Sequence, residues 1–290
     1  MGLFTISQDT CNQDGICAAV CPAGIIEMHD DGYPSPAADA DEICIRCGHC
    51  VAVCPTASLN HTDVPLEAYI PVEKHLHISH EQSVQFLRNR RSIRRYKDKP
   101  IPKTELQQLI DIARFAPSGQ NSQCVEWLVL GEKTELQRPS GIVVDWMRWM
   151  VDNNPEVAAL FHMERTISRW EDGNDVILRE APAVIVAHAH KENRAAPPAC
   201  VIALTYLELA ATTMRMGGCW AGYFNAAATA FRPMQEALPC PKITRHSAHD
   251  GGVPPVQIPT VAVPQRAGHH LAIIIRRAIV ICKVCRSIRT

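Results

Sequence analysis

Two runs of cysteine near the N-terminus contain the residues of this sequence best suited to chemistry. The second run reads Cys44-x-x-Cys47-x-x-Cys50-x-x-x-Cys54 and is followed by Pro55. Thiolates at this spacing bind iron–sulfur clusters, with the first three around one cluster and the fourth on a neighbouring cluster. The second run therefore predicts a partner run with the same spacing.

The partner run lies upstream and differs from the second run at one position. It reads Cys11-x-x-Asp14-x-x-Cys17-x-x-x-Cys21 and also ends in a proline. Asp14 stands where the second cysteine belongs, so we expect two clusters that differ chemically. Two cysteine runs of one spacing do not arise readily by chance, and together they predict a pair of iron–sulfur clusters.

Closely spaced cysteines also serve structural zinc sites and disulfide frameworks. Zinc sites use two close pairs with a longer loop between them, whereas each run here holds three or four candidate ligands and ends in Cys-Pro. Disulfides fit poorly because the cysteine count of 13 is odd and residues 1–10 lack the features of an export signal. The sequence therefore favours clusters in a reduced, cytoplasmic protein.

The part of the chain that holds both runs resembles a bacterial two-cluster ferredoxin, in which the fourth cysteine of each run binds the other run's cluster. The resemblance implies a [4Fe–4S] cluster, here called cluster II, on Cys44, Cys47, Cys50 and Cys21. The other cluster, cluster I, would then use Cys11, Cys17 and Cys54. Asp14 would either ligate cluster I as [4Fe–4S] or stand aside from a [3Fe–4S] cluster, and both alternatives stay open.

Size and charge limit the remaining possibilities. The chain has 290 residues, of which 47% are hydrophobic, and a formal net charge of −1. This length allows two domains, and no apolar run reaches the length of a membrane span. The near-neutral charge gives no case for nucleic acid or a membrane as a partner.

The elements that must position the chemistry divide the chain near a stretch rich in proline and histidine. We expect an iron–sulfur domain at residues 1–62, a linker at 63–80 and a second domain at 81–238. Apolar periodicity and composition predict helices at 80–90, with Ser79 as the cap, at 103–116, within 143–179 and at 199–216. Strands are expected at 126–131 and 183–189. Helices around a modest sheet without regular βαβ alternation indicate an α+β fold.

Three further segments hold polar and glycine residues in a telling order. The arginine-rich segment 88–96, taken alone, would be interpreted as a solvated basic face or a nucleic-acid patch. It is followed by the segment 116–123 (APSGQNSQ) and, much later, by the glycine segment 217–223 (GGCWAGY). In this order the segments resemble the nitroreductase family of FMN enzymes, over roughly residues 81–238.

The resemblance implies where the first and last of these segments contact FMN. The family's R-x-S-x-R/K element, whose guanidinium groups bind the FMN phosphate and face the ribityl or ring oxygens, falls on Arg90, Ser92 and Arg94. The glycine-rich element, whose backbone N–H groups approach the flavin, falls on Gly218, Ala221 and Gly222.

The middle segment corresponds to the family's P-S-x-x-N-x-Q element. Its matching residues are Pro117, Ser118, Asn121 and Gln123. An asparagine amide both donates and accepts, which suits the mixed edge of a flavin ring. Family members often place Pro-Trp directly after the glutamine, whereas this chain has Cys124 and Val125, so the contacts that flank the ring are expected to differ.

The resemblance also implies a mixed sheet flanked by helices, a homodimer, and chemistry performed by the flavin without an obligatory catalytic side chain. We expect electrons to enter from a ferredoxin-type donor at the clusters or from NAD(P)H at FMN. They would leave to a small-molecule acceptor such as a nitroaromatic or a quinone. The alternatives are an electron-transfer module that serves a partner protein and an inactive product of a frameshift.

The frameshift hypothesis concerns residues 239–290, which do not resemble the end of the family. Members usually close with a segment near G-Y-P, then K-Y-x-R-L-P-x-R and a final Trp. Codons chosen for residues 249–271 and read one base later permit MMVGYPQFKYQRLPFRNEPDITW, which has those features. We therefore hypothesise a frameshift between residues 239 and 249, which would weaken FMN binding or dimerisation. Resequencing the 3′ end of the gene tests it.

Overall fold

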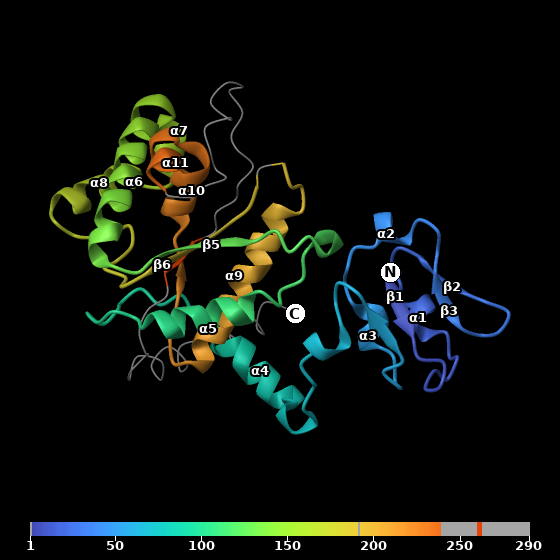
Figure 1. Cartoon of the computed structure of the whole chain (residues 1–290). Helices are drawn as coiled ribbons and strands as arrows, with labels where there is room; N and C mark the ends of the chain where they lie inside the picture. Colours follow the sequence, from blue (N-terminus) through green and yellow to red (C-terminus); the bar gives the residue numbers. More distant parts are fainter. Residues whose placement is uncertain (1, 191, 239–259, 263–290) are drawn as a thin grey trace, which may run out of the picture. The chain divides into compact units, whose positions relative to one another are not determined.

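The structure is a computed structural model that describes residues 2–190, 192–238 and 260–262 (Figure 1). The described residues form two compact units: residues 2–78 with Gly119–Ser122, and residues 79–118 with the described residues from 123 onward. The division between residues 78 and 79 falls inside the linker expected at 63–80. Apart from residues 260–262, the segment of the frameshift hypothesis lies outside the described residues.

The first unit consists of two small sheets and three short helices. Strand β1 (Phe4–Ile6) pairs antiparallel with β4 (Leu59–His61), and β2 (Ile26–Met28) pairs antiparallel with β3 (Pro34–Pro36). The helices are α1 (Ile16–Ala19), α2 (Ala40–Ile43) and α3 (His49–Ala52), and 3-10 turns follow at Leu66–Ala68 and Lys74–Leu76. The fold thus places each cysteine run around one short helix, α1 in the first run and α3 in the second.

The two cysteine runs begin their helices in the same way. Gly15 precedes α1 with φ 67° and ψ 5°, and Gly48 precedes α3 with φ 70° and ψ 6°. This left-handed backbone favours glycine. At Gly48 a Cβ atom would also collide with the Tyr69 hydroxyl, which donates a hydrogen bond to the Gly48 carbonyl at 2.8 Å. The equal spacing seen in the sequence therefore corresponds to an equal local backbone.

The second unit contains a four-stranded sheet in the order β5-β6-β8-β7. Its strands are β5 (Glu126–Leu130), β6 (Val184–His188), β7 (Cys219–Trp220) and β8 (Thr260–Ala262). The α+β class is confirmed. The strand pairs in the described part of the chain are all antiparallel, whereas a mixed sheet was expected. Apolar runs reveal strands but do not encode the direction of the neighbouring strand, so this detail was not readable from the sequence.

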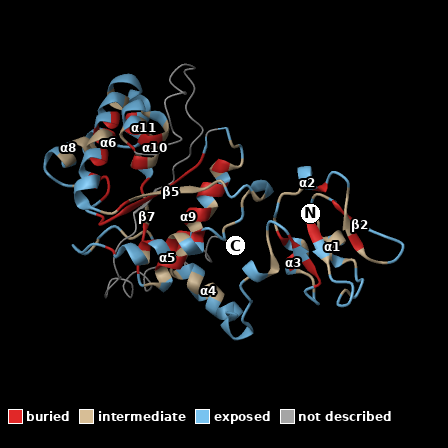
Figure 2. Cartoon of the chain, in the orientation of Figure 1, coloured by how far each residue is buried: buried red, intermediate tan, exposed pale blue. Residues whose placement is uncertain are grey.

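Helices pack against both faces of β6, whose residues are all buried. Figure 2 shows buried segments in red on α6, α9 and α10. The helices of this unit are α4 (His80–Asn89), α5 (Lys103–Ala113), α6 (Lys133–Asn153), α7 (Pro155–Leu160), α8 (Met163–Glu171), α9 (Ala196–Thr213), α10 (Gly222–Ala230) and α11 (Arg232–Ala237). Val184 and Val186 belong to a core with α6 and α10, while Ile185 and Ala187 belong to a core with α5 and α9. Alternate residues of a strand face opposite sides, so β6 lies between two apolar cores.

The expected helices are present, with shifted ends. Ser79 caps α4 as expected, because its hydroxyl accepts the Gln82 N–H at 3.2 Å and the Gln82 side chain accepts the Ser79 N–H at 2.7 Å. Helix α5 ends at Ala113, before the predicted end at residue 116. Pro117 disfavours helical backbone in the residue that precedes it, so the helix does not continue up to the proline. Residues 172–179 are not helical, and α6 begins ten residues before 143.

The helix expected at 199–216 spans Ala196–Thr213 instead. Its first turn contains two prolines, which are tolerated there because the first N–H groups of a helix have no intrahelical partner. None of the helices in the described residues is long and apolar enough to span a membrane.

Candidate functional site

The first unit gathers its cysteines around two cavities. The cavity assigned to cluster II is lined by Cys21, Cys44, Cys47 and Cys50. The cavity assigned to cluster I is lined by Cys11, Asp14, Cys17 and Cys54. Each cavity combines ligands of one run with the last cysteine of the other, which is the crossed arrangement that the ferredoxin resemblance implies. All seven cysteines are free thiols in the structure.

The donor chemistry of the two cavities suits iron–sulfur clusters, which soft thiolates bind. Within the described residues, no three His, Cys, Asp or Glu side chains converge as ligands of one metal. A zinc site needs its ligands within about 2.3 Å of one point. The thiolates of a cubic cluster instead bind separate irons and therefore surround a cavity. The donor set and its arrangement fit two iron–sulfur clusters.

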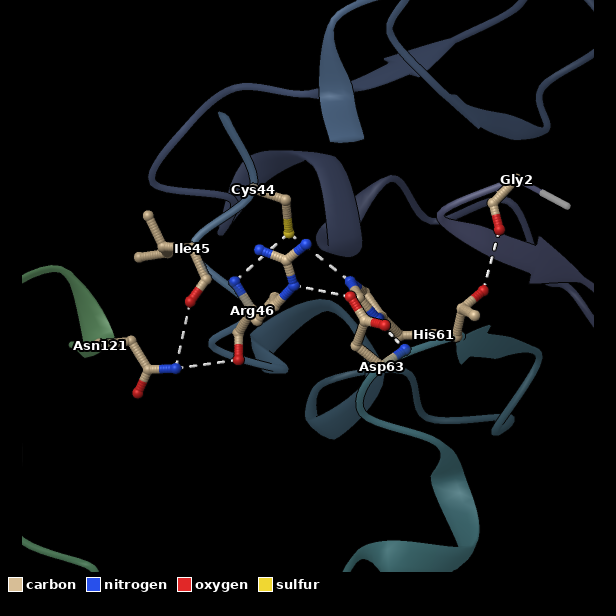
Figure 3. A network of polar contacts seen from close by, with 8 residues as sticks. Gly2, Cys44, Ile45, Arg46, His61, Asp63 and Asn121 are labelled. Carbon is tan, nitrogen blue, oxygen red and sulfur yellow. Dashed lines mark hydrogen bonds and ion pairs between the residues drawn. The ribbon is translucent and has the colours of Figure 1, made fainter. Parts of the chain in front are cut away.

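Hydrogen-bond donors lie close to one cysteine sulfur in each cavity. In the cluster II cavity, the backbone N–H of Arg46 donates to Cys44 Sγ at 3.4 Å, and His61 Nε2 lies 3.5 Å from the same sulfur (Figure 3). At cluster I, the Ser58 N–H donates to Cys54 Sγ at 3.2 Å, and the Thr56 hydroxyl lies 3.6 Å away. Such donors stabilise a thiolate, which is the form that binds iron.

The thiol pKa values follow burial and these hydrogen bonds. Burial raises the pKa of Cys50 to about 11, and burial also raises the pKa of Cys17. For Cys54 burial acts in the same direction, but hydrogen bonds from Thr56 and from backbone N–H groups outweigh it and lower the pKa. The buried thiols must lose their protons when they bind iron.

Asp14 faces the cluster I cavity in place of a cysteine. One of its carboxylate oxygens accepts the N–H of Ile16, the first residue of α1, at 3.1 Å. A carboxylate accepts through two oxygens, so this contact leaves capacity for an iron ligand. Both alternatives for Asp14 therefore stay open.

In the second unit, the arginine segment and the glycine segment are joined directly. The Ile93 N–H donates to the Gly218 carbonyl at 2.9 Å. A Cβ atom on Gly217 would lie 2.5 Å from Ile93 Cγ1, so the close approach requires glycine at position 217. Two of the three segments that resemble FMN-binding elements are therefore neighbours in the fold.

A buried carboxylate, not predicted as a site residue from the sequence, supports the contact between the arginine segment and the glycine segment. Glu208 on α9 is only 4% exposed. One of its oxygens accepts from the Arg90 guanidinium at 3.1 Å and the other from the Trp220 indole N–H at 3.0 Å. The signal in the sequence was that Glu208 is the one charged residue of α9, an otherwise apolar helix. A charge is buried only when it is paired, so Glu208 fixes the position of Arg90.

A cavity of about 580 Å³ lies beside the glycine segment. Its lining includes three of the predicted FMN residues, Arg94, Ala221 and Gly222. This volume falls within the range of about 300–1,000 Å³ typical of sites for small molecules. The Trp146 indole N–H, which also belongs to the lining, is buried and has no acceptor within the described residues. An apolar cavity with a guanidinium, a free donor and a glycine segment fits a flavin or its substrate.

The remaining predicted FMN residues lie outside the described lining of that cavity. Arg90 binds Glu208, Gly218 is buried at the junction, Ser92 is half-buried and Pro117 is exposed. The Ser118 hydroxyl accepts the Gln123 N–H at 2.9 Å and so closes the intervening loop.

The loop 119–122 is grouped with the first unit. The Asn121 amide donates to the carbonyl oxygens of Ile45 at 3.2 Å and Arg46 at 2.9 Å, in the loop of the second cysteine run (Figure 3). The backbone is left-handed at Gln120, Asn121 and Gln123, with φ of 52°, 50° and 43°. Such conformations cost energy in residues other than glycine and are concentrated at functional sites.

Comparisons with known proteins support both resemblances, to the nitroreductase family and to a two-cluster ferredoxin. Residues 87–246, more than half of the chain, match the model of the nitroreductase family, and residues 5–58 match that of a 4Fe-4S dicluster domain. This chain therefore belongs to the nitroreductase family, and it carries a 4Fe-4S dicluster domain on the N-terminal side of the nitroreductase domain. The first match ends at residue 246, inside the stretch where the frameshift is hypothesised.

Two FMN-bound nitroreductase crystal structures illustrate the similarity. One, from Bacteroides fragilis, shares 17% identity over 63% of this chain and 88% of that chain, with a TM-score of 0.48. The other, from Desulfitobacterium hafniense, shares 20% identity over 66% of this chain and 92% of that chain, with a TM-score of 0.49. No curated protein matches this chain.

Proposed function

We propose that this protein is an iron–sulfur flavoprotein oxidoreductase that passes electrons from its clusters through FMN to a small acceptor, such as a nitroaromatic or a quinone. The observation that carries the proposal is the presence, in one chain, of two cavities lined by the predicted cluster ligands and a third whose lining includes Arg94, Ala221 and Gly222. When bound, clusters transfer single electrons and FMN accepts one or two, so the pair links a one-electron donor to a two-electron reduction.

The protein's part in this function is to bind and orient FMN. Arg94 faces the cavity and would pair with the electron-rich oxygens of the ring or ribityl chain. Arg90, held by Glu208, retains further N–H donors for the phosphate because a guanidinium has five. Gly222 is the first residue of α10, where backbone N–H groups have no intrahelical partner and can donate to the flavin edge.

The walls of the cavity support a planar acceptor. Trp146, Phe161 and Tyr223 contribute aromatic surface, and the Trp146 N–H is available to an oxygen of a nitro or carbonyl group. Burial strengthens that donor because water does not compete for it.

Electrons are proposed to enter from a ferredoxin-type donor at the clusters, with NAD(P)H at FMN as the second route. Asn121, which the family resemblance assigns to the flavin edge, donates to the backbone of the cluster II loop at Ile45 and Arg46. A homodimer and a cytoplasmic location remain predictions.

Anaerobic steady-state turnover of a nitroaromatic or a quinone tests the proposal. We expect turnover with a reduced ferredoxin-type donor to be lost in Cys47→Ser, because Cys47 lines the cluster II cavity, while the flavin content is unchanged. Cys200→Ala is the matched control, since Cys200 is a free thiol of the second unit that lies in the core with α5 and α9, outside the described lining of the cluster cavities and of the cavity beside the glycine segment. Equal turnover in Cys47→Ser and wild type would contradict the proposed route. Cluster reduction without turnover in wild type would favour an electron carrier for a partner protein.

A further inference from the structure

A buried histidine lies against the sulfur of a predicted cluster II ligand. His61 is the last residue of β4 and is 2% exposed. Its Nε2 atom lies 3.5 Å from Cys44 Sγ, within reach of a hydrogen bond to sulfur, and the ring belongs to the lining of the cluster II cavity. The register of β4 fixes this position, because His61 stands opposite Phe4 of β1.

The other ring nitrogen determines where the proton of His61 resides. The Asp63 backbone N–H donates to His61 Nδ1 at 3.0 Å. A backbone N–H can only donate, so Nδ1 is the unprotonated nitrogen that accepts. The proton of the neutral ring is then on Nε2, the nitrogen that faces Cys44 Sγ. His61 is therefore a donor to this sulfur.

The residues around His61 hold it in this orientation. The Arg46 guanidinium forms an ion pair with the Asp63 carboxylate at 2.6 Å. The backbone N–H of Arg46 is the second donor to Cys44 Sγ. Figure 3 shows that both donors, Asp63 and the Asn121 amide form one connected network around the cluster II loop. The Asp63 backbone N–H and the burial of the ring thus restrain His61 beside the sulfur.

We propose that His61 tunes the redox potential of cluster II by donating an Nε2–H hydrogen bond to the Cys44 thiolate. Reduction adds negative charge to the cluster and its sulfur ligands, so a donor stabilises the reduced form more than the oxidised form. Hydrogen bonds of this kind from outside the ligand set tune metal sites generally. This bond would therefore raise the potential of cluster II relative to the same cluster without it.

The effect is specific to one cluster. The described lining of the cluster I cavity includes no histidine, and the donors to Cys54 there are a backbone N–H and a hydroxyl. The inference requires only the clusters and does not depend on FMN or on the acceptor.

Potentiometric titration of the anaerobic holoprotein, followed by electron paramagnetic resonance, tests the proposal. His61→Phe keeps a planar ring without the donor, and His61→Gln restores an N–H near the position of Nε2. We expect His61→Phe to lower the ratio of reduced to oxidised cluster II at fixed potential about tenfold, a shift of ~59 mV to more negative values for one electron. His61→Gln should recover part of the shift, and cluster I should not move.

The cluster I signal is assigned by Asp14→Cys, which changes only the ligand set of that cluster. An unchanged cluster II potential in His61→Phe, or an equal shift of both clusters, would overturn the proposal. If His61→Phe fails to retain cluster II, wild-type protein labelled with ¹⁵N-histidine provides the test of the hydrogen bond. Pulsed measurements on reduced cluster II should detect a histidine ¹⁵N coupling that disappears in His61→Gln, and its absence in wild type would also overturn the proposal.

Discussion

Glu208 joins the arginine segment and the glycine segment of the second unit. It joins α9 to Arg90 and to Trp220 through its two oxygens, and its side chain is 5% exposed where that of Arg90 is 34% exposed. Removal of one partner of a buried pair leaves the other charge without compensation. The stability of the second unit is therefore expected to depend on this carboxylate.

We predict that Glu208→Ala lowers the free energy of unfolding of the second unit by about 2–3 kcal/mol, because two donors lose a charged acceptor in a mostly dry environment. Glu208→Gln should lose less, since its amide oxygen still accepts. Urea unfolding followed by tryptophan fluorescence measures both. The matched control is Glu236→Ala, which breaks an exposed ion pair to Arg232 and should change stability by about 0.5 kcal/mol or less. An equal effect of the two alanine variants would contradict the role of Glu208.

At this scale, the sequence predicted residues whose chemistry depends on spacing. The cysteines and Asp14 line two cavities in the groups named from the sequence, and their role as cluster ligands stays a prediction. Glu208 and His61 were missed as functional residues. Their partners, Arg90 and Cys44, are 118 and 17 residues away in the sequence, and only the fold brings them together.

Helix α9 is the element that connects the cores of the second unit to its polar junction. It packs against α5 and β6 and presents Leu204 and Leu207 to them, both fully buried. Its apolar composition on nearly every side was the signal for burial in the sequence. Since Glu208 belongs to the same helix, the packing of α9 also sets the position of Arg90.

We predict that Leu204→Ala destabilises the second unit by about 2–5 kcal/mol, the cost of a cavity left in a packed core. Val201→Ala in the same helix is the control, because Val201 is 38% exposed and its loss leaves little empty space. Thermal unfolding of the two variants gives the comparison. Similar losses from both would mean that α9 is not packed as described.

Element identity was readable from the sequence, whereas element ends and strand direction were not. The strands around residues 126–131 and 183–189 and the capped helix after Ser79 follow from local patterns. The end of α5 at Ala113 and the start of α6 at Lys133 depend on neighbouring backbone and on capping contacts beyond the apolar pattern. The antiparallel pairing of β5 with β6 is a tertiary property.

At the scale of the whole molecule, two chemistries are encoded by two separate parts of one chain. The N-terminal part holds seven of the 13 cysteines within 54 residues, and its buried core is small. A unit of this size gains much of its stability from bound metal clusters. The second unit has two larger apolar cores and holds most of the match to the nitroreductase family. The account therefore requires both kinds of cofactor in the same polypeptide.

The most direct test of this central claim is the cofactor content of anaerobically purified protein. FMN, iron and acid-labile sulfide are quantified per chain, and the absorbance spectrum is recorded in the same sample. The account predicts one FMN and about seven or eight irons per chain, the sum expected for a [4Fe–4S] cluster with a [3Fe–4S] or a second [4Fe–4S] cluster. Iron and sulfide without a flavin band would contradict the account of a flavoprotein, and flavin without iron would contradict the account of the cysteine runs.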